Sequence, residues 1–199
     1  MLQQKNEGAE FEERMESGES FMTTSCCAGY NELVKKHIPE LKPFVSSTHT
    51  PAYYTAEIVR EKYPDAKIVF ISPCVAKRRE VFDNSNIDYV LNAEELGALF
   101  IGRKIEILDC KERIIENNAS KQARNFAVSG GVADAVKHVL KDADMMKPCV
   151  INGITKESIR DLKKYAKNGS CPDCNMIEVM CCEGGCVCGN ATINNERSA

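Results

Sequence analysis

Four cysteines lie within eight residues near the carboxyl end of the chain, at Cys181, Cys182, Cys186 and Cys188. A glutamate and two glycines separate the second cysteine from the third. Cysteine sulfurs can hold zinc or an iron–sulfur cluster, react as nucleophiles, or pair as disulfides. The composition of the chain and the positions of its other cysteines bear on which of these applies.

The composition favours metal binding over disulfides. The chain has 11 cysteines among 199 residues, an odd number. Its start is polar and acidic, without a positively charged segment followed by an apolar one, and no run approaches the roughly 18 apolar residues of a membrane span. We therefore expect a cytoplasmic protein with no membrane span, in a compartment that keeps thiols reduced. The net charge of −3 predicts no nucleic-acid partner.

Strand and helix patterns alternate along the chain, which predicts an α/β fold of mainly parallel sheets flanked by helices. Strands are expected at 21–25, 67–72, 88–91, 126–129, 149–151 and 176–180. Helices are expected around 7–14, 31–37, 51–63, 93–101, 131–140 and 156–167, and another is expected to begin at Pro73. The apolar run at 67–72 is typical of a parallel strand buried on both faces.

Cysteines follow three of these strands, and ligands in such folds bind at the carboxyl ends of the strands. They are Cys26 and Cys27, Cys74, and Cys182 with Cys186. Each position alone is weak evidence, because a lone buried cysteine more often acts as a small hydrophobic residue. Their convergence predicts one shared inorganic centre.

Adjacent cysteines on an extended segment face opposite sides, because side chains alternate along a strand. Cys27 could therefore bind a cluster while Cys26 remains a free thiol able to carry a proton. Lys77 follows Cys74 by three residues, near an expected helix start that favours anions. It could bind an anionic cofactor, or it could belong to a solvated charge run ending at Glu80.

Three motifs, in this order, resemble the signatures of the iron-only (FeFe) hydrogenases: TSCC at 24–27, SPCVAK at 72–77 with Glu80, and EVMCCEGGC at 178–186. FAVSGGV at 126–132 is similar to the glycine turn of that family. The resemblance implies a cofactor-binding catalytic domain over residues 1–190, incomplete in its first lobe at the amino terminus, and a flexible tail at 191–199.

The resemblance also implies a cofactor, the H-cluster. A 4Fe-4S cluster would be held by Cys27, Cys74, Cys182 and Cys186. Cys186 would bridge it to a two-iron subsite bearing carbonyl, cyanide and an azadithiolate. Further cofactor contacts are expected from Lys77, Met180, Ser72 and Pro73. Such hydrogenases interconvert protons, electrons and hydrogen; the alternative is a non-catalytic hydrogen sensor or iron–sulfur protein.

By the same resemblance, protons would pass through Cys26, Ser46, Glu10 and Glu7, with Arg14 near the surface. Glu7, Glu10 and Arg14 have helical spacing and share one helix face. Without the resemblance, an ordinary solvated acidic face would be the simpler interpretation. The implied partners are ferredoxin or another redox carrier, the dedicated maturation proteins, and a missing amino-terminal segment or a partner chain that completes the site.

Some positions depart from the family pattern. The pair Cys26-Cys27 is followed by Ala28 instead of proline, Ser72 stands in place of methionine, and Cys181 in place of alanine. These differences line or adjoin the expected active site and resemble the divergent, sensory branches of the family.

Two further cysteines, in the segment Cys171-Pro-Asp-Cys174, are outside the family pattern. With Cys181 and Cys188 they could form a second, tetrahedral zinc or iron site, or they could be incidental thiols. A plain zinc protein, with ligands only in residues 171–188, is a third functional hypothesis. Cys110 and Cys149 are interpreted as structural.

Overall fold

The computed structural model describes residues 2–83, 86–114 and 119–193. Helices and strands alternate, and all the pairings between strands in the described ranges are parallel. The strands are β1 (Met22–Thr23), β2 (Val69–Ile71), β3 (Tyr89–Leu91), β4 (Pro148–Asn152) and β5 (Met176–Met180). The predicted α/β class is therefore confirmed.

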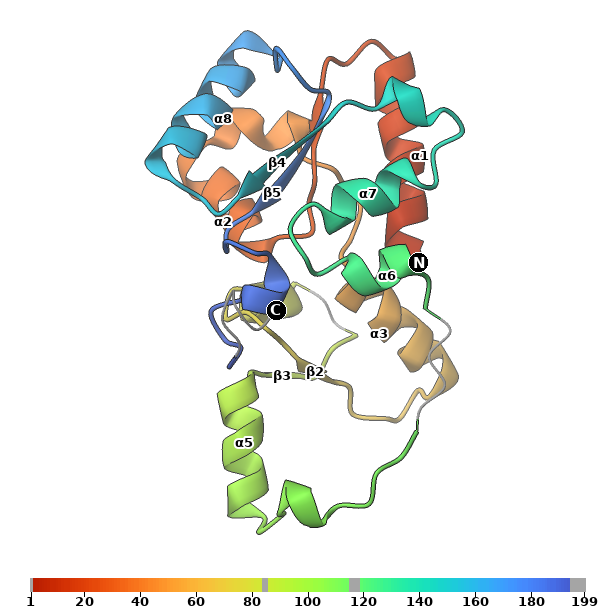
Figure 1. Ribbon diagram of the computed structural model, residues 1–199, viewed down its shortest axis with the longest axis vertical. Coiled ribbons are helices and arrows are strands. Elements are labelled where there is room, and N and C mark those ends of the chain that lie inside the picture. Colours follow the sequence, from red (N-terminus) through yellow and green to blue (C-terminus); the bar gives the residue numbers. More distant parts are fainter. Residues whose placement is uncertain (1, 84–85, 115–118, 194–199) are drawn as a thin grey trace.

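Two separate sheets form (Figure 1). In the first, β5 lies between β1 and β4, with Met22 and Pro148 both opposite Met176. In the second, β2 pairs with β3. All five residues of β5 are buried, as expected for a central strand covered on both faces.

Helices cover both faces of the three-stranded sheet. The principal helices are α1 (Leu2–Glu16), α2 (Ala28–His37), α3 (Pro51–Lys62), α4 (Lys77–Phe82), α5 (Ala93–Gly102), α6 (Lys121–Asn125), α7 (Gly131–Lys137) and α8 (Lys156–Asn168). Short 3-10 turns are η1 (Pro39–Phe44), η2 (Ile107–Asp109), η3 (Ala143–Met145) and η4 (Cys186–Cys188). Among the described residues, no helix has the length and apolar content that crossing a bilayer requires.

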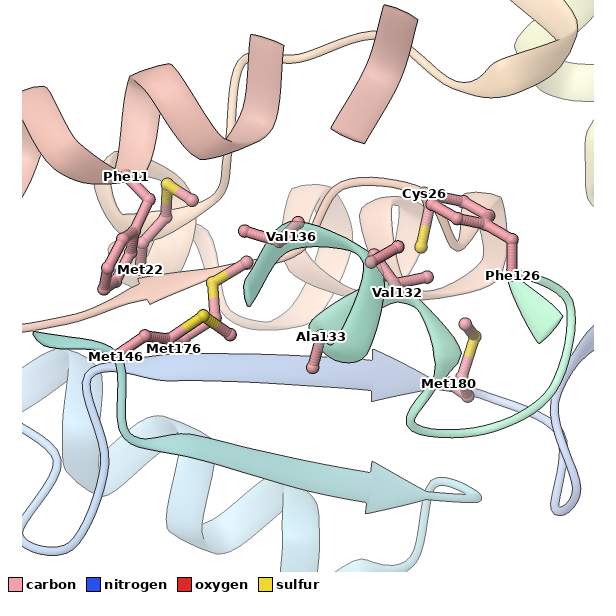
Figure 2. Close-up of a cluster of buried hydrophobic side chains, with 11 residues drawn as sticks. Phe11, Met22, Cys26, Phe126, Val132, Ala133, Val136, Met146, Met176 and Met180 are labelled. Atoms are coloured by element: carbon pink, nitrogen blue, oxygen red, sulfur yellow. The ribbon is translucent and has the colours of Figure 1, made fainter. Parts of the chain in front are cut away.

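One core lies between the sheet and helices α1 and α7, with Phe11 from α1 and Val132 and Val136 from α7 (Figure 2). Three methionines on or near the strands, Met22, Met176 and Met180, fill the same space. We call this cluster the methionine core. Cys26 belongs to it and is 6% exposed.

A second core lies on the opposite face, where α2, η1 and α8 pack. Tyr30 and Val34 of α2 meet Leu41 of η1 and Leu162 of α8. Helix α8 begins with a capping box between Thr155 and Ser158, which satisfies backbone N–H groups at its first turn. We call this cluster the α8 core.

Three local predictions were wrong. Residues 126–129 form a turn with an isolated antiparallel bridge from Val128 to Gly185, because the following glycine pair starts α7 instead of continuing a strand. Helix α4 begins at Lys77 rather than at Pro73. Strand β2 is parallel but not buried on both faces, since Val69 and Ile71 are each 44% exposed.

Candidate metal-cluster site

A cavity of about 100 Å³ lies beyond the carboxyl ends of β1, β2 and β5. The four predicted ligands line it: Cys27, Cys74, Cys182 and Cys186. Cys26, Lys77 and Met180 line it as well. Strand ends therefore bring together residues that are up to 160 positions apart, as parallel topology predicts.

Cys27 lies at the amino end of α2, where it is the N-cap residue. The Cys181 thiol donates a hydrogen bond to the Cys27 sulfur, and backbone N–H groups of Cys181, Tyr30 and Gly29 also point at it. These donors lower the pKa of Cys27 to about 6 and raise that of Cys181. Cys27 is thus prepared as a thiolate, the form that binds metals.

Cys74 is held in a tight turn before α4. The Ser72 hydroxyl donates to the Cys74 carbonyl oxygen at 2.8 Å and accepts from the Cys74 N–H at 3.1 Å. The Ala76 N–H lies 3.3 Å from the Cys74 sulfur. Ser72 and Pro73 are outside the cavity lining, so they shape the turn that presents Cys74.

Cys182 lies two residues after the end of β5, and Cys186 is the first residue of η4. Burial raises the pKa of both thiols, that of Cys186 to about 11, and the neighbouring cluster cysteines raise them further. Four thiolates this close repel one another, so a cationic group among them is needed for all four to ionise. The donor set therefore fits a positively charged iron–sulfur core.

Glycines allow the segment that contains Cys186 to approach the turn at Cys74. Gly185 has a φ of +89°, a conformation that other residues rarely adopt. At Gly189, an added Cβ would lie 2.3 Å from the Pro73 carbonyl oxygen and 2.9 Å from that of Cys186. Only glycine lets these two stretches touch.

Lys77 is not part of a solvated charge run, since its side chain is 9% exposed. Its ammonium group donates to the Cys26 carbonyl oxygen at 3.0 Å and pairs with the Glu80 carboxylate. Glu80 also accepts a hydrogen bond from the Thr50 hydroxyl. The positive charge of Lys77 favours the thiolate of Cys186 at the cavity wall.

Glu7 is fully buried, so the solvated-face interpretation fails for it. Burial raises its pKa to about 7, although Gln3 donates a hydrogen bond to its Oε2 at 3.1 Å. Its Oε1 makes no well-formed hydrogen bond to the described residues, although the Ser25 N–H is close enough to lower the pKa of the carboxyl. Burial also raises the pKa of the Cys26 thiol, and the nearby charge of Glu7 raises it further.

Glu10 and Arg14 form a second polar group with Ser46. The Ser46 hydroxyl donates to Glu10 Oε2 at 2.7 Å, and Arg14 donates to Glu10 Oε1 at 2.8 Å. Hydrogen bonds from Ser47, Ser46 and Thr48, and the charge of Arg14, lower the pKa of Glu10 in spite of burial. Among the described residues, no direct hydrogen bond joins Ser46 to Glu7.

The burial of Glu178 and its hydrogen bonds were not predicted from the sequence. It is fully buried in the middle of β5 and accepts hydrogen bonds from the N–H groups of Gly130, at 2.8 Å, and Ala133, at 2.7 Å. Burial raises its pKa, and its charge raises the pKa of Cys26. The signal in the sequence was a carboxylate in the middle of a five-residue strand that is otherwise apolar.

The second metal site proposed from Cys171, Cys174, Cys181 and Cys188 does not form. Cys171 and Cys174 precede β5, whereas Cys181 and Cys188 follow it. Five strand residues between them span about 16 Å, too far for four ligands of one ion. Within the described ranges, no group of histidine, cysteine or acidic residues is arranged around a single metal ion.

Comparison with known proteins decides the family. Residues 2–190 match the family described as "Iron only hydrogenase large subunit, C-terminal domain". The chain belongs to this family. The motifs that carry the resemblance and the cysteine-lined cavity therefore occur in an iron-only hydrogenase domain.

Two curated relatives of this hydrogenase domain are named as hydrogenases. The periplasmic Fe hydrogenase large subunit of Nitratidesulfovibrio vulgaris is 28% identical over 92% of the chain, and the match covers 55% of that protein. Iron hydrogenase 1 of Clostridium pasteurianum is 26% identical over 92% of the chain, covering 40% of its length. The chain thus spans about half the length of these relatives. Since one is periplasmic by name, a cytoplasmic location stays a prediction.

Solved structures confirm the hydrogenase fold. A variant of FeFe-hydrogenase HydA1 from Chlamydomonas reinhardtii matches with a TM-score of 0.73 and 21% identity, covering 98% of the chain and 68% of that structure. A structure described as showing stepwise H-cluster assembly in HydA matches with a TM-score of 0.72, 22% identity and the same coverage.

Proposed function

We propose that this chain binds an H-cluster and serves as the catalytic domain of a hydrogenase, which interconverts two protons and two electrons with hydrogen. One observation carries the proposal: four thiols from three distant motifs line a single cavity that also contains Cys26 and Lys77. A cluster of iron and sulfide matches thiol ligands drawn from several strand ends.

Cys27, Cys74, Cys182 and Cys186 would hold the 4Fe-4S part, and Cys186 would also bridge to the two-iron subsite. When bound, this group supplies the iron centre at which protons and electrons combine. Lys77 would donate to a cyanide ligand, and Met180 would pack against the subsite, because both line the cavity. Ser72 and Pro73 would fix the turn at Cys74.

Proton movement would depend on Cys26 and the carboxylates of α1. Glu7 has a pKa of about 7, so near neutral pH it can both accept and release a proton. Its Oε1, which makes no well-formed hydrogen bond to the described residues, provides an acceptor, and bridging water between Ser46 and Glu7 would join the inner group to the Glu10 group. Arg14 would hold Glu10 ionised near the surface.

Electrons would come from ferredoxin or another redox carrier, and the two-iron subsite from dedicated maturation proteins. The relatives are much longer than the matched region, so a further segment or partner chain would complete the hydrogenase. The domain would extend over residues 1–190, with 191–199 as a tail; positions 194–199 lie outside the described residues.

The test is to produce the chain together with the maturation proteins and record its infrared spectrum. Bound carbonyl and cyanide should give bands that an ordinary 4Fe-4S cluster does not give. Hydrogen evolution from reduced viologen should then fall sharply in Cys26→Ala while iron content is kept, and Cys110→Ala should match the unaltered chain. Iron without carbonyl and cyanide bands would indicate a non-catalytic iron–sulfur protein instead.

A further inference from the structure

Three cysteines gather at the end of β5 that is opposite the cavity. Cys171 and Cys174 lie in the loop between α8 and β5, with their sulfurs 2.6 Å apart. Cys149 lies on β4, and its thiol is within hydrogen-bond reach of Cys174. The loop thus completes a thiol group whose third member comes from the neighbouring strand.

The two loop thiols differ in access. Cys174 is 5% exposed and belongs to the α8 core. Cys171 is partly exposed, and an open surface cavity lined by Lys147 and Asp173 leads to it. Cys174 also borders this cavity but is buried, so a reagent from solution would meet the more exposed Cys171 first.

The number of ligands argues against a metal ion. A structural zinc ion takes four ligands, and among the described residues only the thiols of Cys149, Cys171 and Cys174 meet here. Aspartate and histidine do not complete a site either, since no metal-binding group occurs among the described residues. Contact between two thiols is the arrangement that precedes a disulfide.

We propose that Cys171 and Cys174 form a reversible dithiol–disulfide pair that reacts with low-molecular-weight disulfides. The Cys171 thiolate attacks the incoming disulfide, forming a mixed disulfide and releasing one thiol. Cys174 then loses its proton and attacks the Cys171 sulfur, which closes the Cys171–Cys174 bond and releases the second thiol. The protein loses two electrons and two protons, and the small disulfide gains them.

The surroundings favour the closed form. Burial, together with hydrogen bonds to Cys171 and Cys149, raises the pKa of Cys174, so the buried thiol is not stabilised as a thiolate in the reduced pair. Cys27, at the amino end of α2, is in the opposite situation, because hydrogen bonds lower its pKa to about 6, and it is a proposed metal ligand instead.

The proposal does not depend on the H-cluster, and the full chain can test it. The reduced protein is equilibrated with mixtures of glutathione and glutathione disulfide, quenched with acid, alkylated and cleaved after Lys167 and Glu178. The resulting peptide, residues 168–178, contains only Cys171 and Cys174. We expect it to lose both alkylatable thiols together and two hydrogens in mass, and a dithiol reductant should restore both.

Variants separate the roles of the two thiols. Cys174→Ser should trap glutathione on Cys171, because the mixed disulfide can no longer be resolved. Cys110→Ser, which removes an exposed thiol elsewhere, should leave the 168–178 result unchanged. Glutathione on both cysteines of the unaltered chain, a Cys149–Cys174 bond, or bound zinc that is lost in Cys171→Ser would each overturn the proposal. The first measurement needs no variant to fold.

Discussion

The Lys77 ammonium group lies 3.0 Å from the carbonyl oxygen of Cys26 and donates a hydrogen bond to it. This contact joins the start of α4 to the turn after β1, across 51 positions of sequence. It therefore fixes two walls of the cavity relative to each other. The same ammonium pairs with Glu80, so a single buried charge serves both the local helix and the distant loop.

Replacing Lys77 by methionine should lower the free energy of unfolding by about 2–4 kcal/mol, because a largely buried carboxylate and a carbonyl lose their partner. Urea-induced unfolding of the full chain measures this. Lys35→Met is the matched control, since Lys35 is 56% exposed and pairs only at the surface, and it should cost less than about 0.5 kcal/mol. Equal losses in the two variants would show that the buried contact adds no stability.

Glu7→Gln should change how stability depends on pH. The folded-state pKa of Glu7 is raised from 4.5 to about 7, so the native state holds a proton that the unfolded state releases between these values. Stability contributed by the protonated carboxyl is present below pH 4.5 and is lost as the pH rises to about 7.

Above neutral pH, Glu7→Gln should thus be more stable than the unaltered chain by about 3 kcal/mol, and near pH 4 the two should agree. Urea unfolding across this pH range provides the comparison. Glu13→Gln, at an exposed position of the same helix, should leave the profile unchanged. A constant difference at all pH values would disprove the raised pKa.

Cys181→Ala should make Cys27 less reactive in the metal-free chain. The Cys181 thiol is the largest contributor to the low pKa of Cys27, and its removal raises that pKa and lowers the thiolate fraction at pH 7. Alkylation of Cys27 by iodoacetamide, followed by peptide mapping, should slow by about five-fold or more. Cys188→Ala serves as the control, and an unchanged rate in Cys181→Ala would remove its thiol from the environment of Cys27.

Gly189→Ala should weaken iron binding. An added Cβ would meet the Pro73 carbonyl oxygen at 2.3 Å, and relief requires the Cys186 segment to move away from Cys74. After reconstitution with iron and sulfide, the variant should retain less than about half of the normal iron on gel filtration. Gly97→Ala is the control, because nothing lies within 4 Å of its new methyl group and helix propensity favours alanine. Normal iron retention in Gly189→Ala would contradict the close packing.

Sequence patterns predicted the parts of the fold that depend on local order. Strand β5 was predicted with its observed limits, since five consecutive residues suit a covered strand and a polar loop precedes them. The joint position of the cysteine motifs followed from parallel topology. The strand predicted at 126–129 was wrong, because an apolar run suggests a strand even where the glycines that follow it turn the chain.

Other features depend on pairing between strands, which spacing does not reveal. Cys149 was interpreted as structural, and its contact with Cys174 arises only because β4 lies beside β5 with Cys149 opposite Ile177. Apart from Arg14 on the same helix, the donors to Glu10 likewise come from 36 to 38 positions away. Lys77 could be read as solvated or buried, and only the packing of α4 against the Cys26 turn decided it.

The proposed cluster ligands come from two sheets. Cys27, Cys182 and Cys186 follow strands of the three-stranded sheet, whereas Cys74 follows β2 of the other, and the η4 segment lies between the two (Figure 1). An inorganic group bound by all four cysteines would link the two sheets to each other. Cofactor binding and the packing of the two sheets against each other would then be thermodynamically coupled. The affinity for iron would depend on how well the two sheets pack.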